Sequence, residues 1–77
     1  MYTTAVDKAQ DALVLARENN AHWYAPYEYQ YAQANLDKAY EEASHAEYED
    51  AVKLARAALD YAGRALRIAE RQRFEEH

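Results

Sequence analysis

The sequence predicts an all-α fold, a three-helix bundle whose last helix is much longer than the other two. Only one of the 77 residues is glycine and one is proline, so few residues interrupt helices. Alanines recur at steps of three and four in three separate segments, and this spacing marks one face of an α-helix. We therefore expect a single domain over residues 1–77, with helices at about 3–19, 26–44 and 47–74.

The helix expected at 47–74 has the most regular pattern. Its alanines form a nearly straight seam along one face, made of Ala51, Ala55, Ala58, Ala62, Ala65 and Ala69. Larger apolar residues flank this alanine seam, with Leu59 and Leu66 on one side and Leu54, Tyr61 and Ile68 on the other. Methyl groups allow a close helix neighbour. We expect partners over the seam and along both edges.

The helix expected at 3–19 carries a similar alanine pattern. Thr3 or Thr4 is the expected N-cap, with Asp7 close behind, where the helix dipole favours a carboxylate. Residues 19–25 are expected to form a connection, because Asn19 and Asn20 tolerate turn conformations.

Pro26 suits the first position of the second helix. The buried positions expected in that helix are Tyr29, Ala32, Leu36, Ala39 and Ala43. A break at 44–47 is predicted because the alanine spacing shifts there by one residue, which is about 100° of helix rotation. Ser44, with Glu47, is the expected capping box of the third helix.

The charges are unevenly distributed along the chain. Residues 1–50 contain three Lys/Arg and ten Asp/Glu, whereas residues 51–77 contain six and four. An acidic chain is a poor partner for nucleic acid. No apolar run approaches the ~20 residues of a membrane span, and the chain contains no cysteine. We predict no nucleic-acid partner, no membrane span and no cofactor.

One stretch carries a family resemblance. The run from Ala21 to Glu28, whose most specific part is Tyr24-Ala25-Pro26-x-Glu28, and the later Tyr48 followed by the alanine ladder resemble an Ala-rich helical domain family of unknown function in bacterial envelope proteins. The resemblance implies a TPR-like bundle and a periplasmic, outer-membrane-associated or extracellular location. Asn20 and Ala46 stand where that family often has glycine. Family members look like lipoproteins, often with an OmpA-like domain, so we expect an excised module or a minimal relative.

Two surfaces are candidates for function. An interface is expected along the third helix, because that helix is longer than the other two and leaves apolar residues uncovered. The residues expected in this interface are Ala58, Tyr61, Ala62, Ala65, Leu66, Ile68, Ala69 and Phe74. A possible ligand surface comprises Trp23, Tyr24, Tyr27 and Tyr31, because Trp and Tyr are enriched in binding surfaces.

No nucleophile with its base and no set of metal ligands is visible, so we do not expect an enzyme or a metal site. The sequence favours a structural or protein-interaction module that associates with itself, as a homo-oligomer or filament, or with another envelope protein. The alternative is a carbohydrate- or peptidoglycan-binding module that uses the Trp/Tyr cluster.

Overall fold

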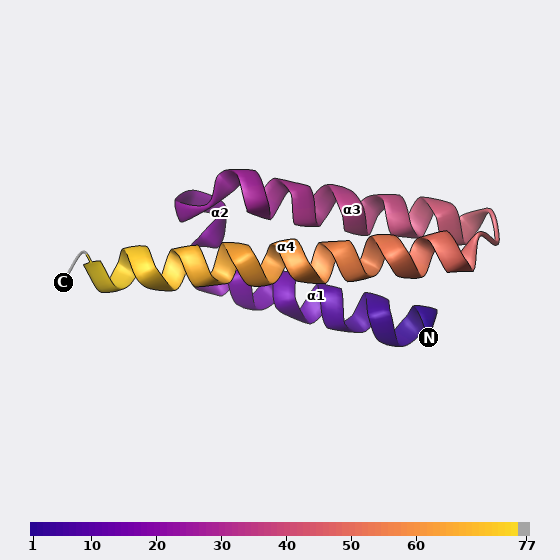
Figure 1. The fold of residues 1–77 in the computed structure, drawn as a ribbon, viewed down its shortest axis with the longest axis horizontal. Coiled ribbons are helices and arrows are strands. Elements are labelled where there is room, and N and C mark those ends of the chain that lie inside the picture. Colours follow the sequence, from indigo (N-terminus) through magenta and orange to yellow (C-terminus); the bar gives the residue numbers. More distant parts are fainter. Residues whose placement is uncertain (76–77) are drawn as a thin grey trace.

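The computed structural model describes residues 1–75, and these residues form four helices: α1 (Tyr2–Glu18), α2 (Ala21–Tyr24), α3 (Pro26–Ser44) and α4 (Tyr48–Glu75). The all-α class is confirmed, but the described chain has four helices where three were expected. The molecule is a rod with extents of 47 × 19 × 14 Å. Figure 1 shows α4 running along almost its full length.

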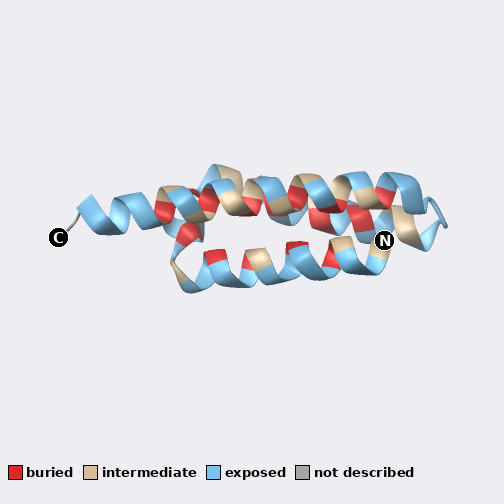
Figure 2. Ribbon diagram, turned by 60° about the horizontal axis from the view of Figure 1, so that its bottom comes forward, coloured by how far each residue is buried: buried red, intermediate tan, exposed pale blue. Residues whose placement is uncertain are grey.

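α4 is the shared partner of the other three helices. α1 and α3 each pack extensively against α4 and only slightly against one another, and α2 packs mainly against α4. In Figure 2 the buried residues of α1 and α3 face α4. The fold is therefore organised around one long helix.

The alanine seam of α4 forms the centre of the core, as predicted. All six of its alanines have 0% of their surface exposed. Opposite them lie the larger buried side chains Val6 and Leu13 of α1 and Leu36 of α3. Small residues on α4 thus face larger residues on its neighbours, which lets the helices pack closely without leaving a void.

The first connection differs from the expected loop. Asn20, two residues after the end of α1, adopts a left-handed conformation with φ 62°, so the chain changes direction there. The chain then makes a helical turn, α2, whose amides at Trp23 and Tyr24 donate to the Asn20 carbonyl. Ala21 and the following Ala25 are buried against Ala65 and Ala69 of α4. Burial of these two alanines explains why the segment is helical rather than irregular.

The second connection breaks the helix between Ser44 and Tyr48, as the shift in alanine spacing predicted. Ala46 has a left-handed φ of 62°, and its amide donates to the Ala43 carbonyl at 2.9 Å while the Glu47 amide donates to the Glu42 carbonyl at 2.9 Å. This pair of bonds is a Schellman motif, in which the left-handed position usually holds glycine.

The predicted N-terminal caps are wrong. α1 begins at Tyr2 with Met1 as its N-cap and without a side-chain cap, so Thr3 and Thr4 lie inside its first turn. Ser44 ends α3, and its hydroxyl donates to the Glu41 carbonyl at 2.6 Å. Ser44 therefore satisfies the end of the preceding helix instead of starting the next one.

Candidate functional site

The uncovered end of α4 is the first candidate surface. Every residue from 70 to 75 is exposed, and Phe74 is the most exposed large hydrophobic residue, at 86%. Figure 1 shows this segment extending beyond the bundle at the end opposite the α3–α4 turn. Residues 64–73 contain four arginines and one glutamate. We call residues 70–75 the tail; it contains the exposed ring of Phe74 together with two arginines and two glutamates.

The structure changes the interface that was expected on this helix. Four of its members, Ala58, Ala62, Ala65 and Ala69, are fully buried by the chain's own helices. Tyr61, Leu66 and Ile68 are half-buried, and Leu66 and Ile68 pack beside the cluster that contains Ala21 and Ala25. Because α2 supplies this cover, only Phe74 of the predicted set is freely available to another molecule.

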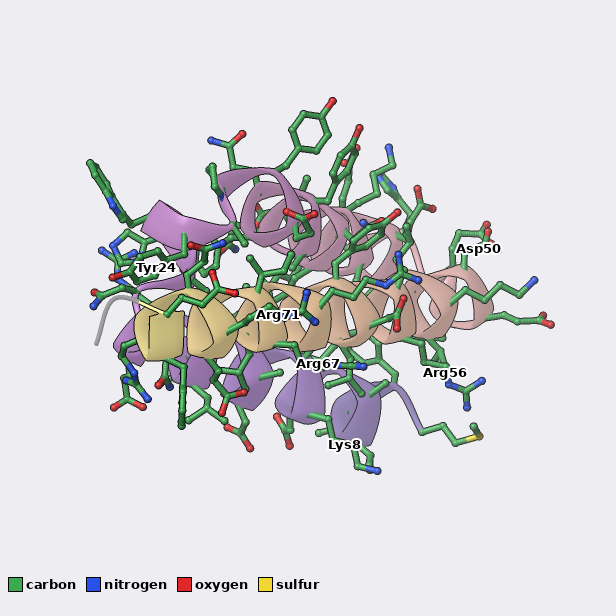
Figure 3. All side chains as sticks on the ribbon, turned by 60° about the vertical axis from the view of Figure 1, so that its left-hand side comes forward. Lys8, Tyr24, Asp50, Arg56, Arg67 and Arg71 are labelled. Carbon is green, nitrogen blue, oxygen red and sulfur yellow. The ribbon has the colours of Figure 1, made fainter. Side chains whose placement is uncertain are left out.

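The opposite end of the rod is acidic and carries exposed apolar groups. Residues 41–50 contain five carboxylates and no Lys or Arg. Met1 and Tyr48 are exposed there and, with Val52, line part of a hollow of about 370 Å³. The ring of Tyr48 meets the ring of Tyr2 edge to face, with 5.7 Å between centroids. We call this surface the head; Figure 3 shows Asp50 at this end and Tyr24 at the other.

A row of aromatic rings crosses from α3 to α4 on the side of the rod. The centroids of Tyr27 and Tyr31 are 5.2 Å apart, and Tyr31 stacks on Tyr61 of α4 at 5.4 Å with 24° between the planes. The guanidinium of Arg64 lies 5.2 Å from the Tyr61 centroid and pairs with Asp60 at 2.9 Å. We call Tyr27, Tyr31, Tyr61 and Arg64 the tyrosine ladder.

The ladder influences the protonation of its central member. A side-chain hydrogen bond with Tyr27, the charge interaction with that residue, burial and the Tyr61 phenol together raise the pKa of Tyr31 above its ordinary value. The hydrogen bond with Tyr27 is the largest cause of the raised pKa. It acts by stabilising the neutral phenol.

The four residues of the predicted ligand surface do not form one surface. Tyr27 and Tyr31 lie together in the ladder, whereas Tyr24 is half-buried and packs against the cluster at the tail end. Trp23 is 77% exposed on α2. The sequence analysis assigned Tyr61 to the interface rather than to this surface and did not single out Arg64, because only the fold brings α4 to the side of Tyr31.

Within residues 1–75, no three His, Asp or Glu side chains are grouped so that they could hold a metal ion. None of the helices in this part of the chain is both long enough and apolar enough to cross a lipid bilayer. Searches of family models, curated proteins and solved structures found no match to this chain.

Proposed function

We propose that this chain is a non-enzymatic structural module that associates end to end with copies of itself. The observation that carries the proposal is the difference between the two ends of one rod: an uncovered tail with an exposed phenylalanine between an arginine and a glutamate, and an acidic head with a hollow beside it. The tail of one copy would contact the head of the next.

The tail offers a large apolar side chain and two arginines, and the head offers a hollow and five carboxylates. Phe74 is a large apolar group without cover in the chain, and burying one such side chain contributes roughly 1.5–3 kcal/mol. The hollow at the head, lined by Met1, Tyr48 and Val52 together with the charged residues Glu49, Lys53 and Arg56, is a site in which such a ring could lie. Arg71 and Arg73 around Phe74 would then face the carboxylates of residues 41–50, which would fix the orientation of the contact.

Such a contact is heterologous, since it joins two different surfaces of the same chain. A heterologous contact that does not close into a ring produces an open filament. The 47 Å length of the rod sets the expected order of the axial repeat. The alanine seam takes no part, because it is already occupied within the chain.

A bacterial envelope location is part of this proposal and is supported by the resemblance of Tyr24-Ala25-Pro26-x-Glu28 to envelope helical domains. In a variant of this proposal the chain is a TPR-like bundle, and another envelope protein, instead of a second copy of the chain, binds at the head or the tail.

Light scattering coupled to size-exclusion chromatography, over a concentration series, tests the association. We expect the measured molecular mass to increase with protein concentration and to decrease in ~1 M salt, where charge interactions are screened beyond about 3 Å. Electron microscopy of the largest species should show unbranched filaments. A strict monomer at all concentrations in low salt would refute the proposal.

A charge-reversed tail variant gives a sharper test. It carries Arg71→Glu and Arg73→Glu, which leaves residues 70–75 with four carboxylates and no Lys or Arg. This tail would face the five carboxylates of residues 41–50 with charge of the same sign, so the variant should stay monomeric. Association as strong as that of the parent would refute the charge pairing.

Phe74→Ser tests the apolar part of the contact. Its matched control is Tyr27→Ser, which removes an aromatic ring of similar exposure from the side of the rod. We expect only the first to reduce association. Equal effects of both changes would show that general surface hydrophobicity, rather than the tail, drives assembly.

A further inference from the structure

The tyrosine ladder carries a second inference that is independent of the end-to-end contact. Beside it lies a hollow of about 340 Å³ lined by Tyr27, Gln30, Tyr31 and Ala34. This volume is at the small end of the ~300–1,000 Å³ found for small-molecule sites. All four lining residues lie on the first turns of α3, and none of them belongs to the tail or to the head.

The rings at this hollow are held in place. Tyr31 contacts both the ring of Tyr27 and the stacked ring of Tyr61, and the Arg64 guanidinium lies 5.2 Å from the Tyr61 centroid. Tyr27, at the open end of the row, remains 70% exposed. The chain therefore holds these solvent-exposed aromatic rings in position before any ligand binds, which lowers the entropy cost of binding.

The polar groups at the hollow are neutral. Gln30 has a carboxamide that can donate and accept, and the two tyrosines have hydroxyls. The cation of the ladder, Arg64, does not line the hollow and is paired with Asp60 at 2.9 Å. Ala34, one turn beyond Gln30, leaves room for a ring because its side chain is a single methyl. An anionic ligand would lack a free positive partner here.

We propose that this hollow binds a neutral pyranose ring of a carbohydrate. A pyranose presents axial C–H groups, whose partial positive charge suits the negative face of a tyrosine ring. Its hydroxyls match the amide of Gln30 and the phenols, which both donate and accept hydrogen bonds. Tyr27 is the stacking residue, Gln30 the hydrogen-bonding residue, and Tyr31 is a positioning residue that the ladder holds.

The test is a titration of the ¹⁵N-labelled full chain with cellotetraose and with tetra-N-acetylchitotetraose, up to about 20 mM because a single stacked ring gives affinities near the millimolar level. The charge-reversed tail variant serves as the background, so that assembly and sugar binding are measured separately. We expect amide shifts confined to residues 27–34 and the neighbouring turn at Tyr61 and Arg64.

Three variants separate binding from folding. Tyr27→Ala should weaken binding about tenfold or more, and Tyr27→Phe should retain most of it, because the ring makes the stacking contact. Ala34→Leu should abolish binding by filling the hollow while leaving the helix stable, since leucine is a good helix former. Tyr48→Ala, an exposed tyrosine at the head, should leave binding unchanged.

Absence of shifts with both sugars, or shifts centred elsewhere, would overturn the inference. So would shifts at residues 27–34 produced by a polyproline decapeptide and by neither sugar, which would assign the hollow to a peptide. Undiminished sugar binding by folded Ala34→Leu would likewise overturn it. None of these outcomes depends on whether the chain forms filaments.

Discussion

Replacing Ala46 by glycine should stabilise the protein. Ala46 is exposed and holds a left-handed φ of 62° in the turn between α3 and α4. A residue with a Cβ loses roughly 1–2 kcal/mol in this conformation, whereas glycine loses roughly 0.5–1 kcal/mol more backbone entropy on folding. The difference is a gain of about 0.5–1 kcal/mol. For a domain of this size, that raises the melting temperature by about 2–8 °C.

Two further glycine substitutions make the measurement specific. Asn20→Gly, at the other positive-φ position, should have a smaller effect, because asparagine tolerates the left-handed region better than alanine. Ala34→Gly, at an exposed position inside α3, should cost about 1 kcal/mol.

Thermal and urea unfolding followed by circular dichroism, on the charge-reversed tail variant to exclude assembly, measure all three. The order of stability should be Ala46→Gly, then Asn20→Gly, then Ala34→Gly. A melting temperature for Ala46→Gly below that of the parent would refute the assigned turn.

Three other changes test the core and the ladder. Ala62→Leu should cost about 1–3 kcal/mol by overpacking a fully buried site; urea unfolding that shows no loss would mean that α4 is not packed closely. Leu36→Ala should cost about 2–5 kcal/mol, a large part of the ~4–12 kcal/mol expected for 77 residues, and an unchanged urea midpoint would contradict the burial of Leu36. Tyr27→Phe should move the pKa of Tyr31 down toward 10.0, because it removes the hydrogen bond that favours the neutral phenol; NMR titration of the tyrosine ring carbons measures this, and an unmoved pKa would contradict the bond. Since the raised pKa of Tyr31 favours the protonated folded state, its contribution to stability is present below pH 10 and is lost as the pH rises through the folded-state pKa.

Local sequence signals were sufficient for the main helices. Pro26 begins α3 at the expected residue, and α1 and α4 lie within about one residue of their expected limits. The alanine seam was predictable because a 3.6-residue period identifies a buried face without knowledge of the partner. The same period located the second turn through its shift of register, although that turn contains neither glycine nor proline.

The errors arose where tertiary contacts override local preference. Residues 21–24 have polar and aromatic neighbours that suggest a loop, yet burial of Ala21 against α4 makes them helical. That unforeseen helix covers Leu66 and Ile68 and shortens the expected interface. Ser44 has the same capping chemistry at either side of a turn, so only the backbone path shows which helix it serves. The stack of Tyr31 on Tyr61 joins residues thirty positions apart, and no periodicity encodes such a pair.

The dependence of every other helix on α4 has a consequence for biosynthesis. A ribosome makes α1, α2 and α3 first, yet their buried faces meet the helix that emerges last. An isolated helix of 17 or 19 residues is marginal in water. The first three helices should therefore remain largely unfolded during synthesis until α4 has emerged from the exit tunnel.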